Sequence, residues 1–212
     1  MRADPGSTDE LLRRAAKGEE GALAELFEGY RGRLRQMVRL RLDRRLQGRV
    51  DPSDVLQDAY LDLARTLEDY TARPALPFFL WLRLVVGERL LRVHRQHLGA
   101  AMRDADREIS LNHGAIPQVS SASLAAQLLG RFTTASRAVA RAEMQQRLQD
   151  ALNGMDPIDR EVIALRHFEE LSNDEVAALL GLTKGAASKR YVRAMLRLKA
   201  HLGGMPGLDE DH

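Results

Sequence analysis

The sequence has no cysteine, few aromatic residues, and no stretch apolar enough to span a membrane. The absence of cysteine excludes disulfides, a thiol nucleophile and any zinc site built on thiolates. The longest strongly apolar run, residues 78–86, is nine residues long and contains Arg83, whereas a membrane helix needs about 20 residues. The first ten residues lack the apolar stretch of a secretory signal, so we expect a cytoplasmic protein without a membrane segment.

The 212 residues include 32 Lys and Arg against 30 Asp and Glu, which gives a net charge of only +2. These charges are distributed unevenly. Residues 51–69 contain six acids and one arginine, residues 184–199 contain six cations and no acid, and residues 31–49 contain eight arginines and one aspartate. Local surfaces, and not the total charge, therefore indicate the partners.

Apolar residues recur at intervals of three and four along most of the chain, and β-branched residues are sparse. This pattern predicts an all-α fold with no obvious place for a strand. We expect an N-terminal helical bundle over residues 10–98 and a C-terminal domain over residues 135–202. Residues 99–134, rich in Ser, Ala, Gly and Gln, read as a flexible linker with a short helical segment at Leu124–Leu129, and residues 203–212 as a disordered tail.

Residues 171–198 have the pattern of a helix-turn-helix. The segment Ser172-Asn173-Asp174-Glu175 is a capping box, Gly181 lies in the turn, and Thr183 is the expected cap of a second, basic helix that begins at Lys184. On that helix Ser188, Lys189 and Arg190 are candidate contacts to bases or phosphates. The alternative is a solvated basic face. The residues expected in the core are Val176, Leu179, Leu180, Leu182, Val192 and Leu196.

An acidic helix is predicted to start at the Asp51 cap and Pro52. Its carboxylates Asp54, Asp58 and Asp62 recur every four residues, and no histidine joins them to suggest a metal site. Because this surface would repel DNA, we expect it to bind a basic protein element. The arginine-rich stretch 31–49 could pair with this helix, contact nucleic acid, or do both. The expected buried face of the acidic helix is Leu56, Ala59, Tyr60, Leu63 and Leu67.

Four aromatic residues, Tyr70, Phe78, Phe79 and Trp81, fall within twelve positions of one another beside the proline-containing stretch 68–77. Aromatic rings can hold unstacked bases, with cations on the phosphates. The candidate cations are Arg83, Arg89, Arg92 and Arg95. Since Phe78 and Phe79 are adjacent, we expect that they cannot both face one core, whereas Trp81 is expected to be a core residue.

No pattern for catalysis is evident. The six histidines are scattered, and there is no phosphate-binding glycine loop of the P-loop or dinucleotide type. We therefore expect no enzymatic activity, no bound metal and no cofactor.

Taken in order, these elements resemble a bacterial RNA polymerase sigma factor of the extracytoplasmic-function (ECF) group. The segments Phe78-Phe79-Leu80-Trp81-Leu82-Arg83 and Leu165-Arg166-His167-Phe168-Glu169-Glu170-Leu171-Ser172 look like those of planctomycete-type members. The resemblance covers about residues 11–202. It implies that the bundle is sigma region 2 and the helix-turn-helix is sigma region 4, in a protein that directs promoter recognition, melting and transcription initiation.

The resemblance also implies site residues and partners. Core RNA polymerase, through its β′ clamp coiled coil and β flap, and promoter DNA are the expected partners, with an anti-sigma factor as a further one. Residues 68–77 would capture a flipped base of the minus-ten element. The implied polymerase-binding residues are Asp54, Gln57, Asp58, Leu61 and Asp62; those for the minus-ten element are Tyr70, Phe78, Phe79, Arg83, Arg89 and Arg92; those for the minus-thirty-five element are Lys184, Ser188, Lys189, Arg190 and Arg193.

A second hypothesis is a stand-alone helix-turn-helix regulator whose N-terminal bundle is a dimerisation or ligand module. Such a regulator would bind duplex DNA tightly on its own, usually as a dimer, whereas a sigma factor would bind it poorly without polymerase.

Overall fold

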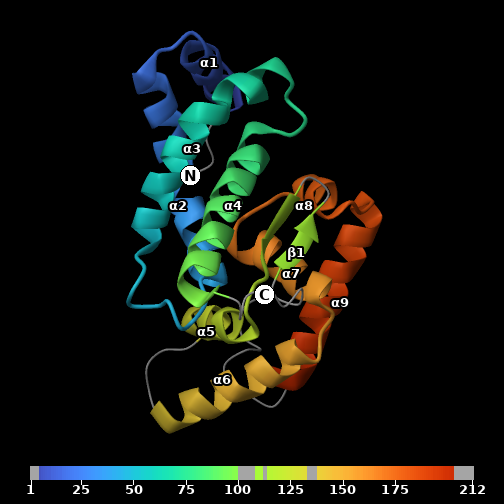
Figure 1. Cartoon of the computed structure of the whole chain (residues 1–212). Coiled ribbons are helices and arrows are strands. Elements are labelled where there is room, and N and C mark those ends of the chain that lie inside the picture. Colours follow the sequence, from blue (N-terminus) through green and yellow to red (C-terminus); the bar gives the residue numbers. More distant parts are fainter. Residues whose placement is uncertain (1–4, 100–107, 112–113, 133–137, 203–212) are drawn as a thin grey trace. The chain divides into compact units, whose positions relative to one another are not determined.

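The computed structural model divides the chain into two compact units, Met1–Pro117 and Gln118–His212 (Figure 1). It describes all residues except 1–4, 100–107, 112–113, 133–137 and 203–212. Each unit is treated by itself. The prediction of a disordered tail at 203–212 lies outside the described residues.

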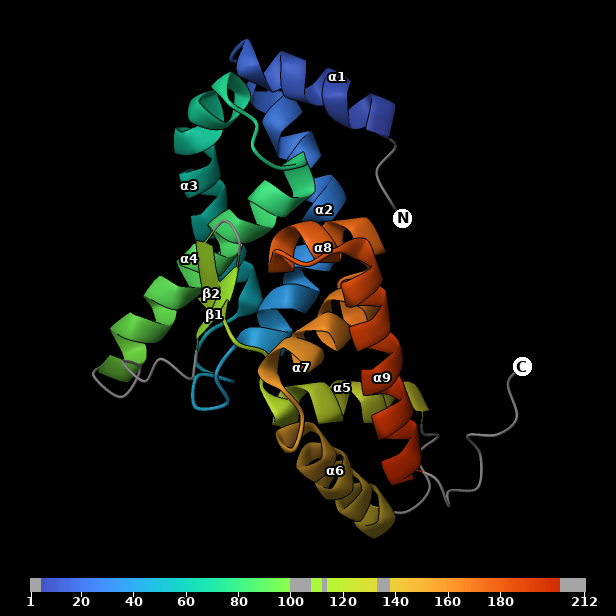
Figure 2. The same cartoon turned by 90° about the vertical axis from the view of Figure 1, so that its right-hand side faces the viewer.

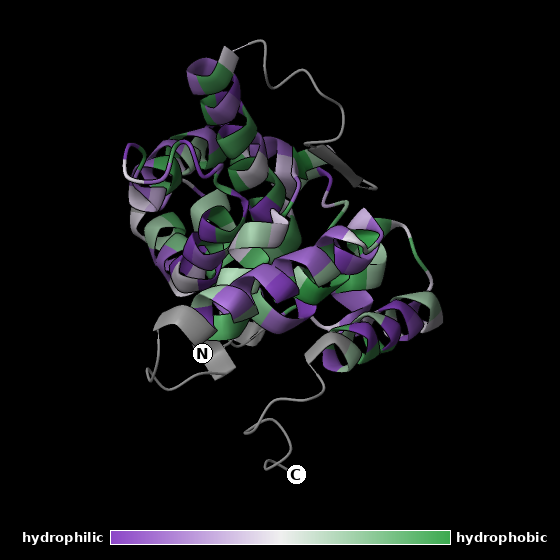
Figure 3. Cartoon of the chain, turned by 90° about the horizontal axis from the view of Figure 1, so that it is seen from below, coloured by the Kyte–Doolittle hydropathy of each residue, from purple (hydrophilic) through white to green (hydrophobic). Residues whose placement is uncertain are grey.

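The first unit is built around four helices, α1 (Pro5–Ala16), α2 (Glu20–Arg41), α3 (Pro52–Ala72) and α4 (Phe78–Leu98). α2 packs against α1, α3 and α4, and α3 also packs against α4. The predicted bundle is therefore confirmed. Its core is formed by fully buried aliphatic side chains that include Leu34, Leu56, Leu63, Leu80, Leu82 and Leu90. Along the helices, hydrophobic and hydrophilic residues alternate as amphipathic packing requires (Figure 3).

Helix α3 begins as its sequence predicts. The Asp51 side chain accepts a hydrogen bond of 2.7 Å from the backbone N–H of Ser53, and Pro52 occupies the first helical position. At the other end, α3 continues to Ala72, so Tyr70 lies on the helix and not in the loop expected over residues 68–77. The irregular stretch between α3 and α4 is correspondingly short.

A two-stranded antiparallel sheet packs beside α4, and the expectation that no strand forms is therefore wrong (Figure 2). Its strands are β1 (Glu108–Leu111) and β2 (Gly114–Pro117). Ile116 of β2 is fully buried. A Cβ atom added to Gly87 of α4 would lie only 2.2 Å from Cγ2 of Ile116, so the missing side chain of Gly87 is what lets the strand approach the helix.

The second unit contains α5 (Ser121–Phe132), α6 (Ala138–Asn153), α7 (Pro157–Ile163), the π-helix η3 (Ala164–Phe168), α8 (Asn173–Leu180) and α9 (Lys184–Leu202). α5 packs on α6, and α9 packs against α6, α7 and α8. The helical segment predicted at Leu124–Leu129 is confirmed as part of α5. Regular structure therefore occupies 108–111, 114–117 and 121–132 of the segment whose composition predicts a linker.

Candidate polymerase and promoter surfaces

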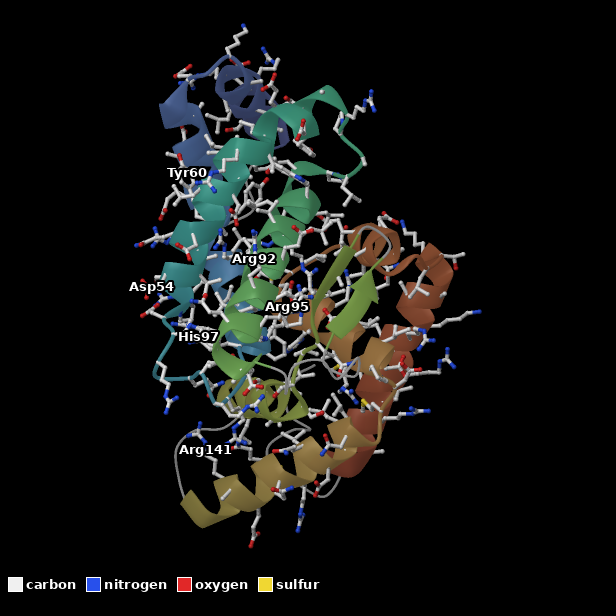
Figure 4. The ribbon with its side chains drawn as sticks, viewed as in Figure 1. Asp54, Tyr60, Arg92, Arg95, His97 and Arg141 are labelled. Carbon is white, nitrogen blue, oxygen red and sulfur yellow. The ribbon has the colours of Figure 1, made fainter. Side chains whose placement is uncertain are left out.

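One face of α3 combines carboxylates with an exposed leucine. Asp54, Gln57 and Asp58 are exposed, and Leu61 is 54% exposed although it is a large apolar residue. On the opposite face Leu56, Ala59, Leu63 and Leu67 are buried as predicted, whereas Tyr60 is half-buried. Val55, which is not among the residues predicted to be buried, also belongs to this face. We call Asp54, Gln57, Asp58 and Leu61 the α3 acidic face. Asp54 is labelled near the start of α3 in Figure 4.

Asp62 does not belong to this exposed face, although its four-residue spacing from Asp58 predicts that it does. Its Oδ2 atom accepts hydrogen bonds from Arg89 Nε at 2.8 Å and from Arg92 Nη2 at 2.7 Å, and its side chain is only 11% exposed. This carboxylate, paired with two cations, links α3 to α4, and its loss would leave a largely buried guanidinium poorly compensated. The geometry thus joins a predicted polymerase contact to two predicted DNA contacts within the bundle.

The predicted aromatic site divides into a surface pair and a buried pair. The rings of Tyr70 and Trp81 are stacked with their centroids 4.2 Å apart, and both residues are half-buried. The Tyr70 hydroxyl donates a 3.0 Å hydrogen bond to the Leu76 carbonyl, and burial raises the pKa of that hydroxyl. Trp81, expected to be a core residue, is therefore only partly buried.

Phe78 and Phe79, in contrast, are both buried, so the expectation that they cannot share one core is wrong. The reason is Tyr30 of α2, whose ring centroid lies 6.0 Å from that of Phe78 and 5.1 Å from that of Phe79. The guanidinium of Arg33 covers the Phe79 ring at 3.7 Å from its centroid. As arranged here, neither phenylalanine presents a face for a base.

Among the predicted minus-ten arginines, exposure also differs. Arg83 is fully buried in α4, and Arg89 is only 21% exposed beside Asp62. Arg92 retains a half-exposed side chain, and Arg95 one turn further is exposed (Figure 4). Direct contact with a phosphate is therefore open to Arg92 and Arg95, and the buried Arg83 is removed from it.

The helix-turn-helix of α8 and α9 forms as predicted. Ser172 and Glu175 complete a reciprocal capping box at the start of α8, and Gly181 ends that helix in the left-handed conformation with φ of 63°. Thr183 Oγ1 accepts a 3.2 Å hydrogen bond from the backbone N–H of Ala186, which caps α9. The Asn173 side chain also donates to the Lys184 carbonyl at 2.8 Å, tying the two helices together at the turn.

Immediately before α8 the backbone takes two less common conformations. The π-helix η3 widens the end of α7, and Glu170 has a φ of 56° without being glycine. The Arg166 side chain donates a 3.0 Å hydrogen bond to the Leu171 carbonyl across this bend. The bend determines where the capping box begins, and it is not detectable from the periodicity of the sequence.

The predicted reading residues lie on the first three turns of α9. Ser188, Lys189 and Arg193 are exposed there, and the Lys184 ammonium, also exposed, lies 3.0 Å from the Asp174 carboxylate. Arg190 is different, because its Nη1 atom lies 2.7 Å from Oδ1 of Asp159 and its side chain is 29% exposed. Arg190 therefore joins α9 to α7 within the unit.

Two predicted core residues of α9 are on its outside. Val192 is 51% exposed and Leu196 is 61% exposed, whereas Ala187, Ala194 and Leu198 are buried. Packing of α6, α7 and α8 onto α9 decides this, because those helices cover the face that carries the alanines. The prediction of a buried Val192 and Leu196 is wrong.

Neither a metal site nor a membrane helix is found among the residues that the structure describes. In that part of the chain no three histidine or carboxylate side chains are grouped closely enough to hold a metal ion. No helix there has the length and apolar character to cross a bilayer.

Comparisons with known proteins cover both units. Residues 145–198, which include all of α8 and most of α9, match the family described as Sigma-70, region 4. The RNA polymerase sigma factor NccH of Alcaligenes xylosoxydans xylosoxydans is 28% identical over 205 residues, covering 94% of this chain and 96% of NccH. The ECF RNA polymerase sigma factor SigD of Mycobacterium tuberculosis is 25% identical over 191 residues, covering 90% of this chain and 82% of SigD.

The solved structure of CnrH in complex with the cytosolic domain of CnrY is similar in fold, with a TM-score of 0.55 and 25% sequence identity. It covers 94% of this chain and 99% of CnrH. Similarity to sigma factors along nearly the whole chain, including the bundle, is not expected of a regulator with an unrelated N-terminal module. The region 4 match, the relatives similar along nearly the whole chain and the fold together support an RNA polymerase sigma factor of the ECF type, a subunit that directs transcription initiation at promoters.

Proposed function

We propose that the α3 acidic face docks on core RNA polymerase, at the coiled coil of the β′ clamp. The observation that carries this assignment is the exposed Leu61 beside the exposed carboxylates of Asp54 and Asp58. An apolar centre bordered by charges of one sign suits a partner with a complementary basic and apolar surface. Asp62 supports this face indirectly, by fixing α3 against α4.

Promoter DNA would contact two other surfaces. The stacked Tyr70 and Trp81, with Arg92 and Arg95 along α4, suit an unstacked base and its phosphates at the minus-ten element. Lys184, Ser188, Lys189 and Arg193 at the start of α9 suit the major groove of the minus-thirty-five element. The β flap of polymerase would hold the second unit near that DNA.

The remaining predictions follow from the same assignment. Residues 10–98 would act as sigma region 2 and residues 135–202 as sigma region 4, and the protein would act in the cytoplasm, where polymerase works. CnrH was solved with the cytosolic domain of CnrY, and an anti-sigma factor is the corresponding partner proposed for this chain. Two motifs, 78–83 and 165–172, support the relationship to planctomycete-type members.

Reversal of charge on the α3 acidic face tests the docking assignment. In the Asp54→Lys/Asp58→Lys chain, affinity for core polymerase should fall at least about tenfold, because two favourable charge contacts become repulsive. The matched control is Glu68→Lys/Asp69→Lys, which makes the same charge change at exposed positions in the last turns of α3. Equal core affinity in the two variants would overturn the assignment, and circular dichroism would verify that both bundles fold.

A further inference from the structure

The outer face of α9 carries an apolar pair on a basic background. Only three large hydrophobic residues in the described part of the chain are strongly exposed, Leu61, Val192 and Leu196. Val192 and Leu196 are one helical turn apart and therefore lie on the same face of α9. Exposed apolar pairs of this kind, bordered by polar residues, are typical of interaction surfaces.

Cations border this pair on both sides. Lys189 lies on the same face one turn before Val192, Lys199 lies one turn after Leu196, and Arg193 flanks the pair. All three are exposed, and none forms an ion pair with any residue that the structure describes. We call Lys189, Val192, Arg193, Leu196 and Lys199 the α9 stripe. A segment that is complementary to the α9 stripe would have apolar side chains next to several carboxylates.

Residues 203–212 have that composition and directly follow α9. They contain Met205 and Leu208, and then the consecutive acids Asp209, Glu210 and Asp211. Gly203 and Gly204 favour a reversal of the chain, and Pro206 disfavours continuation of the helix. The acids come directly after Leu208 in the sequence, and cations lie next to Leu196 on the helix. Leu208 can therefore contact the apolar pair while the acids contact the cations.

The chain after Leu202 is long enough for residues 203–212 to run back along α9. Leu208 is six residues beyond Leu202, a reach of up to ~20 Å for an extended chain. Leu196 is six residues before Leu202 along the helix, a rise of only ~9 Å. The acids that follow can likewise reach the level of Val192 and Lys189 with the chain running back along α9.

We propose that residues 203–212 fold back onto the α9 stripe, with Leu208 against Val192 and Leu196 and with the acids against Lys189 and Arg193. The bound segment covers part of the surface that the proposed function assigns to the minus-thirty-five element, and that consequence rests on the proposed function. The acidic segment would compete with DNA phosphates for the same cations and would restrain the second unit from binding DNA prematurely.

Cross-linking tests the docking without reference to DNA. The natural chain has no cysteine, so the Leu196→Cys/Leu208→Cys variant contains only the two introduced thiols. Its rate of intramolecular disulfide formation with oxidised glutathione is compared with that of the same variant carrying Asp209→Asn, Glu210→Gln and Asp211→Asn. Both chains have the same tether, so a difference in rate reports the attraction by the acids.

We expect the acidic chain to form the disulfide about tenfold faster at low salt, as an effective-concentration effect, and the difference to shrink at high salt as charges are screened. Equal rates in the two chains would overturn the docking. Disulfides formed between chains would also overturn it, because they would make a second copy the occupant. Non-reducing gel electrophoresis separates the two products.

A second measurement separates this inference from the proposed function. Duplex DNA carrying a cognate minus-thirty-five element should bind the full-length chain with the three neutralised acids several-fold more tightly than the natural chain. The control is the chain with Asp209→Glu, Glu210→Asp and Asp211→Glu, which keeps the charge. Charge-dependent cross-linking with unchanged DNA affinity would support the docking and contradict the assignment of Lys189 and Arg193 to DNA.

Discussion

Asp62 of α3 and Arg92 of α4 form an ion pair in which Nη2 of Arg92 lies 2.7 Å from Oδ2 of Asp62. Arg89, one turn earlier on α4, donates to the same oxygen at 2.8 Å. The pairing shows that the regular spacing of acids on α3 serves two purposes. Asp54 and Asp58 remain available to a partner, whereas Asp62 joins the helix with the proposed polymerase surface to the helix with the proposed minus-ten surface.

Asp62→Asn should therefore lower the free energy of unfolding by about 1–2 kcal/mol, because it removes the nearer of the two carboxylates that pair with Arg89, which is 21% exposed, and leaves only Asp58 at 3.7 Å. Asp54→Asn, at an exposed position on the same helix, should change stability by less than about 0.5 kcal/mol. Urea unfolding followed by circular dichroism measures both. Equal stability of the two variants would show that the Asp62 pair contributes nothing to the bundle.

The contact between Gly87 and Ile116 predicts strong coupling between the two positions in a double-mutant cycle. Gly87→Ala alone should destabilise the chain by about 1–3 kcal/mol, because the new methyl group would overlap Ile116. In an Ile116→Ala background the Cγ2 atom is absent, but the Cβ atom of residue 116 would still lie 3.1 Å from the new methyl group, so the same substitution should cost clearly less than in the natural chain. If Gly87→Ala had the same effect in both backgrounds, β2 would not pack on Gly87.

His94 predicts a loss of stability in mild acid. It is 2% exposed, and its pKa is lowered to about 4, chiefly because burial disfavours the imidazolium, while Asp43 raises it and Arg45 lowers it. Its Nε2 atom accepts a 3.3 Å hydrogen bond from the backbone N–H of Asp43. The pKa of Asp43 is lowered to about 2, mainly by the hydrogen bond from Arg45, so that carboxylate stays charged in this pH range.

The direction in which stability changes with pH depends on which state of the chain binds the proton. Above pH 6.5 the histidine is neutral in both folded and unfolded chains, and between pH 6.5 and about 4 only the unfolded chain binds the proton. Stability should therefore decline by up to about 3 kcal/mol across that range and show no further loss from His94 below it. His94→Gln should remove this decline. His97→Gln, at an exposed position on the same helix, should retain it, and a decline that persisted in His94→Gln would contradict the assignment.

Helix starts were predictable from sequence because their signals are local. The caps at Asp51, Thr183 and Ser172 depend on residues two or three positions away, and all three form as expected. The buried face of α9 was not predictable in the same way. Its two sides both carry apolar residues, and remote helices decide that Ala194 and Leu198 are buried in place of Val192 and Leu196.

The β-hairpin and the arrangement of the aromatic site could not be predicted for the same reason, because both depend on residues distant in the sequence. Each strand has only four residues, too few for a clear alternation, and the approach of Ile116 depends on a glycine of α4. Phe78 and Phe79 are both buried because Tyr30, from another helix, contacts both rings. The charge distribution, in contrast, could be seen in the sequence, but only the structure separates the exposed Asp54 and Asp58 from the buried Asp62.

In the proposed function the α3 acidic face serves core binding and the start of α9 serves promoter recognition, and a transcription assay with core polymerase separates these two steps. The template is a promoter recovered by sequencing DNA bound to this protein in its native cell. Lys189→Ala/Arg193→Ala should leave core affinity unchanged and reduce run-off transcripts at least about tenfold, because each lost DNA contact costs about 1–3 kcal/mol. Asp54→Lys/Asp58→Lys should lose core binding and transcripts together. Full transcription by the Lys189→Ala/Arg193→Ala chain, or loss of its core binding, would contradict the division of roles.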